Sequence, residues 1–194
     1  MGNESANRSI AIGLLGAGSV GSNVAAQLVA GHEDLAARAG ANLVLKAVAV
    51  NDGKKPRPEL ETLSKAGVQV TTDAQALVNN PDIDVIIEVI GGIEPARTLI
   101  LEALNSGKSV VTANKALLAQ HGGELFEAAA KNNVDLYFEA AVAGAIPIIR
   151  PLRDSLAGDH VARVMGIVNG TTNYILSQMS SNGISFESAL KELK

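Results

Sequence analysis

The 194-residue chain contains no cysteine, and aromatic residues make up only 3% of it. The absence of cysteine excludes disulfides, thiolate zinc sites and cysteine nucleophiles. The net charge is −4 and no basic run interleaved with aromatic residues occurs, which argues against nucleic acid as a partner. No apolar run reaches the roughly 18–20 residues that a membrane-spanning helix requires. These absences predict a cytoplasmic protein without nucleic-acid or membrane partners.

Small aliphatic residues must build the core, since apolar residues make up 47% of the chain and few of them are aromatic. Such residues suit a parallel sheet that is covered by helices. Short apolar runs that predict strands alternate along the chain with segments of helical periodicity. The predicted strands cover residues 10–15, 43–50, 68–71, 85–90, 109–112 and 136–139, and the predicted helices cover 19–30, 34–39, 73–78, 95–106 and 123–131. This alternation predicts an α/β fold of the Rossmann type, with a doubly wound parallel sheet.

A glycine-rich turn joins the first predicted strand to the first predicted helix. It follows the pattern G-x-G-x-x-G and consists of Gly16, Ala17, Gly18, Ser19, Val20 and Gly21. In this context Gly16 allows a tight turn, Gly18 lets the backbone approach a pyrophosphate, and Gly21 lets the helix pack closely on the strand. The phosphates would lie against unpaired N–H groups at the start of the helix. The turn therefore predicts a dinucleotide site, the alternative being a glycine-rich connection without a ligand.

The sequence leaves the choice between NAD and NADP open. An acidic residue for the adenine ribose is expected about 20 residues after the glycines, and Asp52 is the nearest candidate although it comes later. Lys54, Lys55 and Arg57 follow Asp52 and could pair with a ribose 2′-phosphate, which would favour NADP. A solvated basic turn is the equal alternative.

Three further segments lie at the carboxyl ends of predicted strands, where open parallel sheets collect their ligands. Gly91 and Gly92 would let the backbone pass close to a nicotinamide ribose. Lys115 could polarise a carbonyl oxygen or stabilise a developing alkoxide, or it is an ordinary exposed lysine. Glu139 lies in an apolar stretch, where an unpaired carboxylate is costly to bury. Backbone N–H groups could satisfy it, or a hard cation could bind it together with backbone carbonyl oxygens.

A turn at Asn169-Gly170 follows a predicted strand at 161–168 and precedes a predicted helix at 172–179. Its hydroxyl groups and helix N–H donors suit a carboxylate substrate. Capping of the helix by Thr171 or Thr172 is the alternative.

The sequence predicts three parts. Residues 1–9 are polar without an apolar core, which predicts a disordered leader and no signal peptide. Residues 10–146 form the predicted dinucleotide-binding domain, which a Gly/Ala/Pro-rich stretch ends. Residues 147–194 predict the start of an α+β substrate domain, with a helix at 148–156 and a final helix that has no closing cap. That open end predicts a chain that stops before this domain is complete.

In these segments the chain resembles homoserine dehydrogenases. The matching stretches follow the order and spacing of that family, and they cover residues 16–21, 90–92, 110–119, 138–147 and 169–176. The last three are much more specific than the glycine turn. The resemblance implies NAD- or NADP-dependent interconversion of L-homoserine and L-aspartate 4-semialdehyde, in threonine and methionine biosynthesis. It also implies that the full-length enzyme is a homodimer or homotetramer.

The resemblance assigns roles to individual residues. The glycine turn and Gly91 would contact the cofactor, and Lys115 would lie beside nicotinamide and substrate as a catalytic residue. Gly170 would contact cofactor or substrate, and Thr171 would contact the substrate. A sodium-type monovalent cation would be bound by the carboxylate of Glu139 and the backbone carbonyls of Val142, Gly144 and Ile146.

Two departures from the family pattern bear on these 194 residues. Family members often carry arginine at the end of the second strand, where this chain has Asn51. The family also continues into a segment with substrate-binding acids and a proton-donating lysine, which this chain does not contain. We therefore expect cofactor binding with little or no turnover from this chain alone. A non-catalytic dinucleotide-binding module and a related amino-acid dehydrogenase are the alternatives.

Overall fold

The computed structural model describes residues 8–53, 58–167 and 169–192. The chain divides into two compact units between Val142 and Ala143. Most of the predicted leader lies outside the described residues, and Ser9 at its end already belongs to the first strand. The basic residues predicted to choose between NAD and NADP, at positions 54, 55 and 57, also lie outside the described residues.

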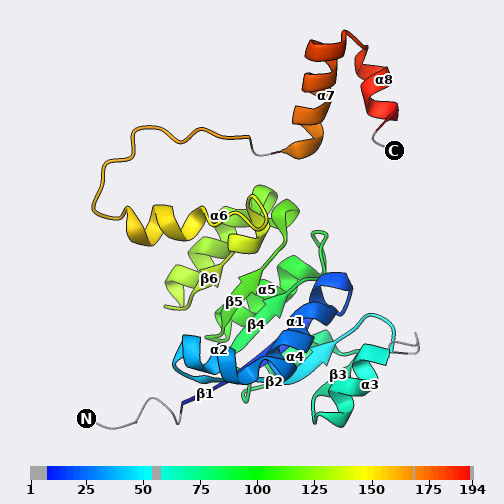
Figure 1. Ribbon diagram of the computed structural model, residues 1–194. Helices are drawn as coiled ribbons and strands as arrows, with labels where there is room; N and C mark the ends of the chain where they lie inside the picture. The colour runs from blue at the N-terminus through cyan, green and yellow to red at the C-terminus, as the bar shows by residue number, and fades with distance from the viewer. Residues whose placement is uncertain (1–7, 54–57, 168, 193–194) are drawn as a thin grey trace. The chain divides into compact units, whose positions relative to one another are not determined.

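The first unit is built on a parallel sheet (Figure 1). Its strands are β1 (Ser9–Leu15), β2 (Asn42–Ala49), β3 (Gln69–Thr71), β4 (Val85–Glu88), β5 (Ser109–Thr112) and β6 (Leu136–Tyr137). Every neighbouring pair is parallel, in the order β3-β2-β1-β4-β5-β6. This order confirms the predicted doubly wound fold. The chain reverses its direction of travel across the sheet between β1 and β4, which is where such sheets open a crevice.

Helices cover both faces of this sheet. They are α1 (Ser19–Ala30), α2 (His32–Ala39), α3 (Pro58–Lys65), α4 (Ala74–Asn79), α5 (Ala96–Asn105) and α6 (Lys115–Lys131). One core lies between the sheet and α4, α5 and α6, and a second core lies between the sheet and α1 and α3. Leu14 and Leu15 are both fully buried, and as neighbours on β1 they point into opposite cores. Burial on both faces explains why β1 is a continuous apolar run.

Helix α6 begins eight positions earlier than the sequence predicted, at Lys115 instead of residue 123. The helix continues through the pair Gly122-Gly123, which lies at the predicted start. Leu117 and Leu125 are fully buried on the same face of the helix, so the packing of this face outweighs the cost of about 1 kcal/mol per glycine.

Helix α3 was not predicted. Its first described residue is Pro58, acidic residues occupy its first turn, and Lys65 lies in its last turn. Proline and acidic side chains at a helix start, with a basic side chain at its end, are the usual favourable pattern. The helix covers the second core with the single buried side chain of Leu63, so its apolar periodicity was weak.

Charged side chains secure the amino ends of the central strands. The ammonium group of Lys108 is buried, and it donates to the carbonyl oxygens of Asn80 at 2.7 Å and Ile83 at 2.8 Å. The carboxylate of Asp84 accepts a hydrogen bond from the backbone N–H of Ala11 at 2.8 Å. This edge of the sheet is therefore held by contacts within the protein.

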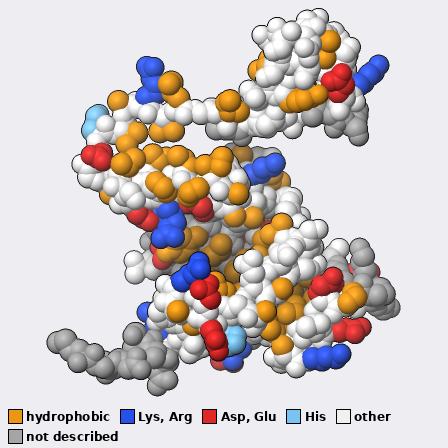
Figure 2. Space-filling model, in the orientation of Figure 1, with side chains coloured by type: hydrophobic (Ala, Val, Ile, Leu, Met, Phe, Trp, Pro, Cys, Tyr) orange, Lys and Arg blue, Asp and Glu red, His pale blue; other side chains and the backbone are white. Residues whose placement is uncertain are grey.

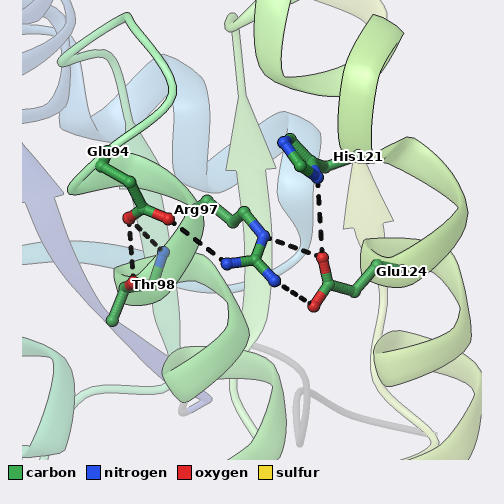
Figure 3. A network of polar contacts seen from close by, with 5 residues as sticks. All are labelled: Glu94, Arg97, Thr98, His121 and Glu124. Carbon is green, nitrogen blue, oxygen red and sulfur yellow. Dashed lines mark hydrogen bonds and ion pairs between the residues drawn. The ribbon is translucent and has the colours of Figure 1, made fainter.

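A polar network joins α5 to α6 at the surface (Figure 3). The guanidinium of Arg97 donates two hydrogen bonds to Glu124 and one to Glu94. Glu94 also accepts from the hydroxyl of Thr98 at 2.8 Å, and this bond, with help from Arg97, lowers the pKa of the Glu94 carboxyl. The hydrogen bond from Arg97 lowers the pKa of the Glu124 carboxyl. His121 lies 3.8 Å from Glu124, within ion-pair distance if it is protonated.

The second unit is described by itself. It contains a short π-helical turn, η3 (Pro151–Ser155), and the helices α7 (Gly170–Asn182) and α8 (Phe186–Lys191). The helix predicted at 148–156 is confirmed over 149–155, where two α-helical residues lead directly into this turn and the N–H of Leu156 donates to the carbonyl of Pro151. Ala189 and Ile175 are buried where α7 and α8 pack together.

The strand predicted at 161–168 is wrong for its described residues, 161–167, which form no strand. A strand needs a neighbour to pair its backbone groups, and these residues have none among the described parts of the chain. Their side chains are correspondingly open to solvent, with Val164 59% and Met165 81% exposed. The space-filling view shows many hydrophobic side chains on the surface of the molecule (Figure 2). Among the described residues, no helix combines the length and apolar character needed to cross a membrane.

The α5–α6 network predicts a pH-dependent contribution to stability. A carboxyl whose pKa is lowered by folding contributes above its unfolded value of about 4.5, and that contribution is lost as the pH falls through the lowered value. We expect Arg97→Met to lower the urea midpoint near neutral pH, and the gap from wild type to close on acidification below about pH 4. Circular dichroism at several pH values measures both midpoints.

The matched control is Arg38→Met, because the one partner that Arg38 has among the described residues is Asp34 on the same short helix. Its effect on the midpoint should be smaller, since it breaks no link between helices. A gap for the Arg97 variant that stays the same down to about pH 3 would contradict the prediction.

Candidate functional site

A cleft of about 500 Å³ opens at the carboxyl ends of β1, β2 and β4. It is lined by Gly16, Ala17, Gly18, Ala49, Val50, Asn51, Thr72, Ala74, Val89, Ile90, Pro95 and Leu99. The first three belong to the predicted dinucleotide turn, and the cleft lies where the strand order reverses. Its place is therefore the one at which open parallel sheets bind their ligands.

Two glycines of the turn are required by the packing of the protein itself. Gly16 has a φ of +102°, which side chains rarely adopt, and a Cβ there would lie 3.0 Å from the carbonyl oxygen of Val89. A Cβ at Gly21 would lie 2.0 Å from the carbonyl oxygen of Gly16. Helix α1 can approach the turn this closely only because Gly21 has no side chain.

Gly18 differs from its two neighbours. Its φ of −76° suits any residue, and a Cβ there would meet no heavy atom within 4 Å. It is the N-cap of α1, and within the described residues no side chain caps this helix end. Ser19 and Val20 follow as exposed residues of the first turn. The start of α1 therefore presents backbone N–H groups beside an open space at the mouth of the cleft.

The loop after β4 is tied to the start of α6. Gly91 and Gly92 have φ values of +80° and +75°, so this loop needs glycine at both positions. The amide of Asn114 donates to the carbonyl of Gly92 at 2.6 Å, and its oxygen caps α6 by accepting from the N–H of Leu117 at 3.1 Å. Lys115 is the first residue of α6, and it is exposed. Neither Lys115 nor Gly91 is among the residues that line the cleft.

The residues expected to bind a cation are divided between the two units. Glu139 begins a 3₁₀ turn, η2 (Glu139–Ala141), and together with Val142 it belongs to the first unit. Gly144 and Ile146 belong to the second unit. Between them, Ala143 and Ala145 have φ values of +51° and +65°. Among the described residues, no group of three or more His, Cys, Asp or Glu is placed to hold a metal ion.

Gly170 and Thr171 are the first two residues of α7, in the second unit. The helix is capped by Asn169, whose side-chain oxygen accepts from the N–H of Thr172 at 2.8 Å. The alternative of a cap by Thr171 or Thr172 is therefore wrong, since Asn169 is the cap. Asparagine is preferred over threonine as an N-cap residue, and its side-chain oxygen at position 169 reaches the N–H three residues later.

Sequence reasoning missed Thr72 as a residue of the cleft, and it named Asn51 only as a departure from the family pattern. Asn51 and Thr72 follow β2 and β3 at the same edge as the glycine turn, and both line the cleft. Their position after apolar strands could have indicated them. Asp52, the residue considered for the adenine ribose, is exposed and does not line the cleft. Glu88 received no role from the sequence, yet it is fully buried at the end of β4.

The glycine geometry makes a prediction about stability. Gly21→Ala forces a Cβ against a backbone carbonyl, so we expect it to lower the free energy of unfolding by about 2 kcal/mol or more. Gly18→Ala places its Cβ in open space, and its cost should stay below about 1 kcal/mol. Urea unfolding of the two variants compares them directly. Equal losses would show that the close approach at Gly21 is not what constrains the turn.

Comparison with known proteins supports one family. The profile described as "Homoserine dehydrogenase, NAD binding domain" matches residues 16–139, and the profile described as "Homoserine dehydrogenase" matches residues 147–194. The homoserine dehydrogenase of Corynebacterium glutamicum is 52% identical over 187 residues, which cover 94% of this chain and 40% of that protein. The homoserine dehydrogenase of Mycobacterium tuberculosis is 53% identical over 186 residues, with the same shares covered.

Solved structures agree with these matches. A homoserine dehydrogenase from Thiobacillus denitrificans has a TM-score of 0.81 at 41% identity, covering 96% of this chain and 42% of that one. A hyperthermophilic archaeal homoserine dehydrogenase in complex with NADPH has a TM-score of 0.71 at 27% identity, covering 95% of this chain and 60% of that one. The chain thus spans about 40% of the length of its curated relatives. Since the first profile alone matches more than half of the residues, the chain belongs to the homoserine dehydrogenase family.

Proposed function

We propose that residues 10–146 bind NAD or NADP for a homoserine dehydrogenase, and that residues 147–194 are the start of its substrate domain. The reaction would interconvert L-homoserine and L-aspartate 4-semialdehyde, in threonine and methionine biosynthesis. One observation carries the proposal: the fold gives no reason for glycine at position 18, and a bound pyrophosphate does.

The three glycines of the turn differ in what the fold requires of them. Gly16 and Gly21 are explained by a positive φ and by close backbone contacts. Gly18 has neither, and the space beside it opens to a cleft of about 500 Å³. A pyrophosphate that approaches the first amides of α1 would use this space, and a side chain there would obstruct it. The helix end is also free of any side-chain cap within the described residues, so its N–H groups are available to an anion.

The sheet order supports one orientation of the dinucleotide. In this fold the adenosine half lies over the end of β2, which here leads to Asn51 at the cleft. The nicotinamide half would then lie on the other side of the glycine turn, toward β4 and β5. That side carries Gly91 and Lys115. The absence of an acidic residue from the described lining leaves both NAD and NADP as ligands of the proposal.

The cofactor would supply the hydride chemistry when bound, and the protein would orient and polarise the reactants. Lys115 is exposed at the start of α6, next to the loop that holds Gly92. Its ammonium group could stabilise the negative charge that develops on the substrate oxygen. Gly170 and Thr171, in the second unit, remain proposed contacts of cofactor and substrate.

Titration with NADPH and NADH tests the proposal. We expect the chain to bind at least one of them, and Gly18→Ala to weaken the binding about tenfold or more by intruding on the pyrophosphate. Isothermal titration calorimetry measures both proteins. Gly123→Ala is the matched control, because it also adds a Cβ in open space, on α6. It should bind like wild type.

The same preparations decide between cofactor binding and full catalysis. Because the chain spans about 40% of the length of its relatives, we expect NADPH oxidation with L-aspartate 4-semialdehyde to be slow or absent. Failure of the folded wild type to bind either dinucleotide would overturn the proposed function. Turnover at an ordinary enzymatic rate of about 10 per second would overturn the expectation of low activity.

A sodium-type cation is the second part of the proposal, with Glu139 and the carbonyls of Val142, Gly144 and Ile146 as ligands. The left-handed backbone at Ala143 and Ala145 supports it, since such conformations concentrate at functional sites. Carboxylate and carbonyl oxygens suit a hard cation.

Thermal unfolding in sodium chloride and in choline chloride of equal ionic strength tests the cation site. Sodium should raise the midpoint of wild type but not of Glu139→Gln. Glu127→Gln, which changes an exposed carboxylate on α6, should keep the sodium effect. Equal midpoints of wild type in the two salts would speak against the site.

A cytoplasmic location, the absence of nucleic-acid and membrane partners, and assembly of the full-length enzyme as a homodimer or homotetramer also remain proposals. Light scattering of the purified full-length protein measures the assembly state.

A further inference from the structure

We infer that Glu88 is a positioning residue, which fixes the nicotinamide side of the cleft by holding the loop after β4 and the start of α6 in one arrangement. The inference rests on the proposed function, because it assumes that the cleft binds a nicotinamide dinucleotide. Glu88 is a buried carboxylate that accepts hydrogen bonds from Ile90, which lines the cleft, and from Gly91.

Glu88 is fully buried, and three hydrogen bonds converge on its carboxylate. One oxygen accepts from the backbone N–H of Ile90 at 2.8 Å and of Gly91 at 3.1 Å. The other accepts from the hydroxyl of Thr112 at 2.6 Å. A carboxylate is costly to bury, and it is kept in place where several donors satisfy it. Glu88 thus shapes the turn at Gly91 directly.

The hydroxyl of Thr112 connects Glu88 to the loop between β5 and α6. It donates to Glu88 and accepts from the backbone N–H of Asn114 at 3.0 Å. Asn114 in turn donates to the carbonyl of Gly92 and caps α6. The hydrogen bonds therefore form a closed network: Glu88 holds Gly91 directly, and it is linked through Thr112 and Asn114 to Gly92 and to the first turn of α6.

Glu88 lies in the sheet between the two strands that lead to the glycine turn and to Lys115. It pairs with Leu15 on β1, directly before the glycine turn, and with Thr112 on β5. The backbone after Glu88 also packs against the turn, since a Cβ at Gly16 would lie 3.0 Å from the carbonyl oxygen of Val89. The carboxylate thus lies between the proposed pyrophosphate site and Lys115.

A purely structural role would predict a different result from a positioning role. Glycines at positive φ have many accessible conformations, so the Gly91-Gly92 loop depends on its hydrogen bonds for its shape. If Glu88 only stabilised the sheet, its replacement would affect every ligand of the cleft alike. If it positions the nicotinamide side, a ligand without nicotinamide should not be affected.

Glu88→Gln is the informative substitution. The amide oxygen can still accept from Ile90 and Gly91, but the amide nitrogen cannot accept, so the hydroxyl hydrogen of Thr112 loses the acceptor that Glu88 supplies. We expect affinity for NADPH to fall about tenfold, as is common when a residue that orients a binding group is changed. Affinity for ADP-ribose, which lacks nicotinamide, should change less than about twofold. The fluorescence of bound NADPH should also shift toward that of the free cofactor.

Asp84→Asn is the matched control. Asp84 is also a carboxylate that accepts a backbone N–H, but it lies at the opposite end of β4. Asp84→Asn should leave the affinities for NADPH and for ADP-ribose unchanged, whatever its effect on stability. Should Glu88→Gln fail to fold, Thr112→Val removes one hydroxyl with little change of volume, and the same loss of NADPH affinity with ADP-ribose retained is expected.

The outcomes separate the two proposals. Wild type that binds neither ligand overturns the proposed function and this inference together. Wild type that binds both, with a folded Glu88 or Thr112 variant that binds NADPH normally or loses both ligands equally, overturns the positioning role alone. Selective loss of NADPH supports it.

Discussion

The structure depends on the close approach of α1 to the turn that precedes it. A Cβ at Gly21 would lie 2.0 Å from the carbonyl oxygen of Gly16, so the helix can start where it does only with a hydrogen atom at that place. This contact fixes the direction of α1, whose amino end lies at the crevice between β1 and β4. The proposed pyrophosphate site depends on this contact, because the direction of the helix decides where its unpaired N–H groups point.

The two ends of the sheet are organised differently, and the difference matches the division between stability and function. At the amino ends, Lys108 and Asp84 satisfy backbone groups of neighbouring loops and strands. At the carboxyl ends, the backbone is left open at Gly18 and is shaped by positive φ values at Gly16 and Gly91. A ligand therefore finds a preformed edge, and little of the energy of binding is lost in ordering it.

Much of the first unit could be predicted from sequence, since buried parallel strands are short apolar runs and the glycine spacing is local. The parts that could not be predicted depend on contacts between distant residues. Glu88 received no role from its position in a predicted strand, and its hydrogen bonds to Gly91 and Thr112 are visible only in the structure. Helix α6 runs through two glycines because Leu117 and Leu125 are buried beneath it. The apolar run at 161–168 predicted a strand, but a strand also requires a neighbour, which periodicity does not reveal.

The described lining of the cleft consists entirely of uncharged residues. An anionic ligand would thus be met there by the partial positive charge of backbone dipoles, equivalent to about half an elementary charge at a helix start. Such a field acts over a short range, whereas a cluster of full cations would attract polyanions from a distance. The described lining therefore offers an anion its attraction close to the start of α1, and not from a distance.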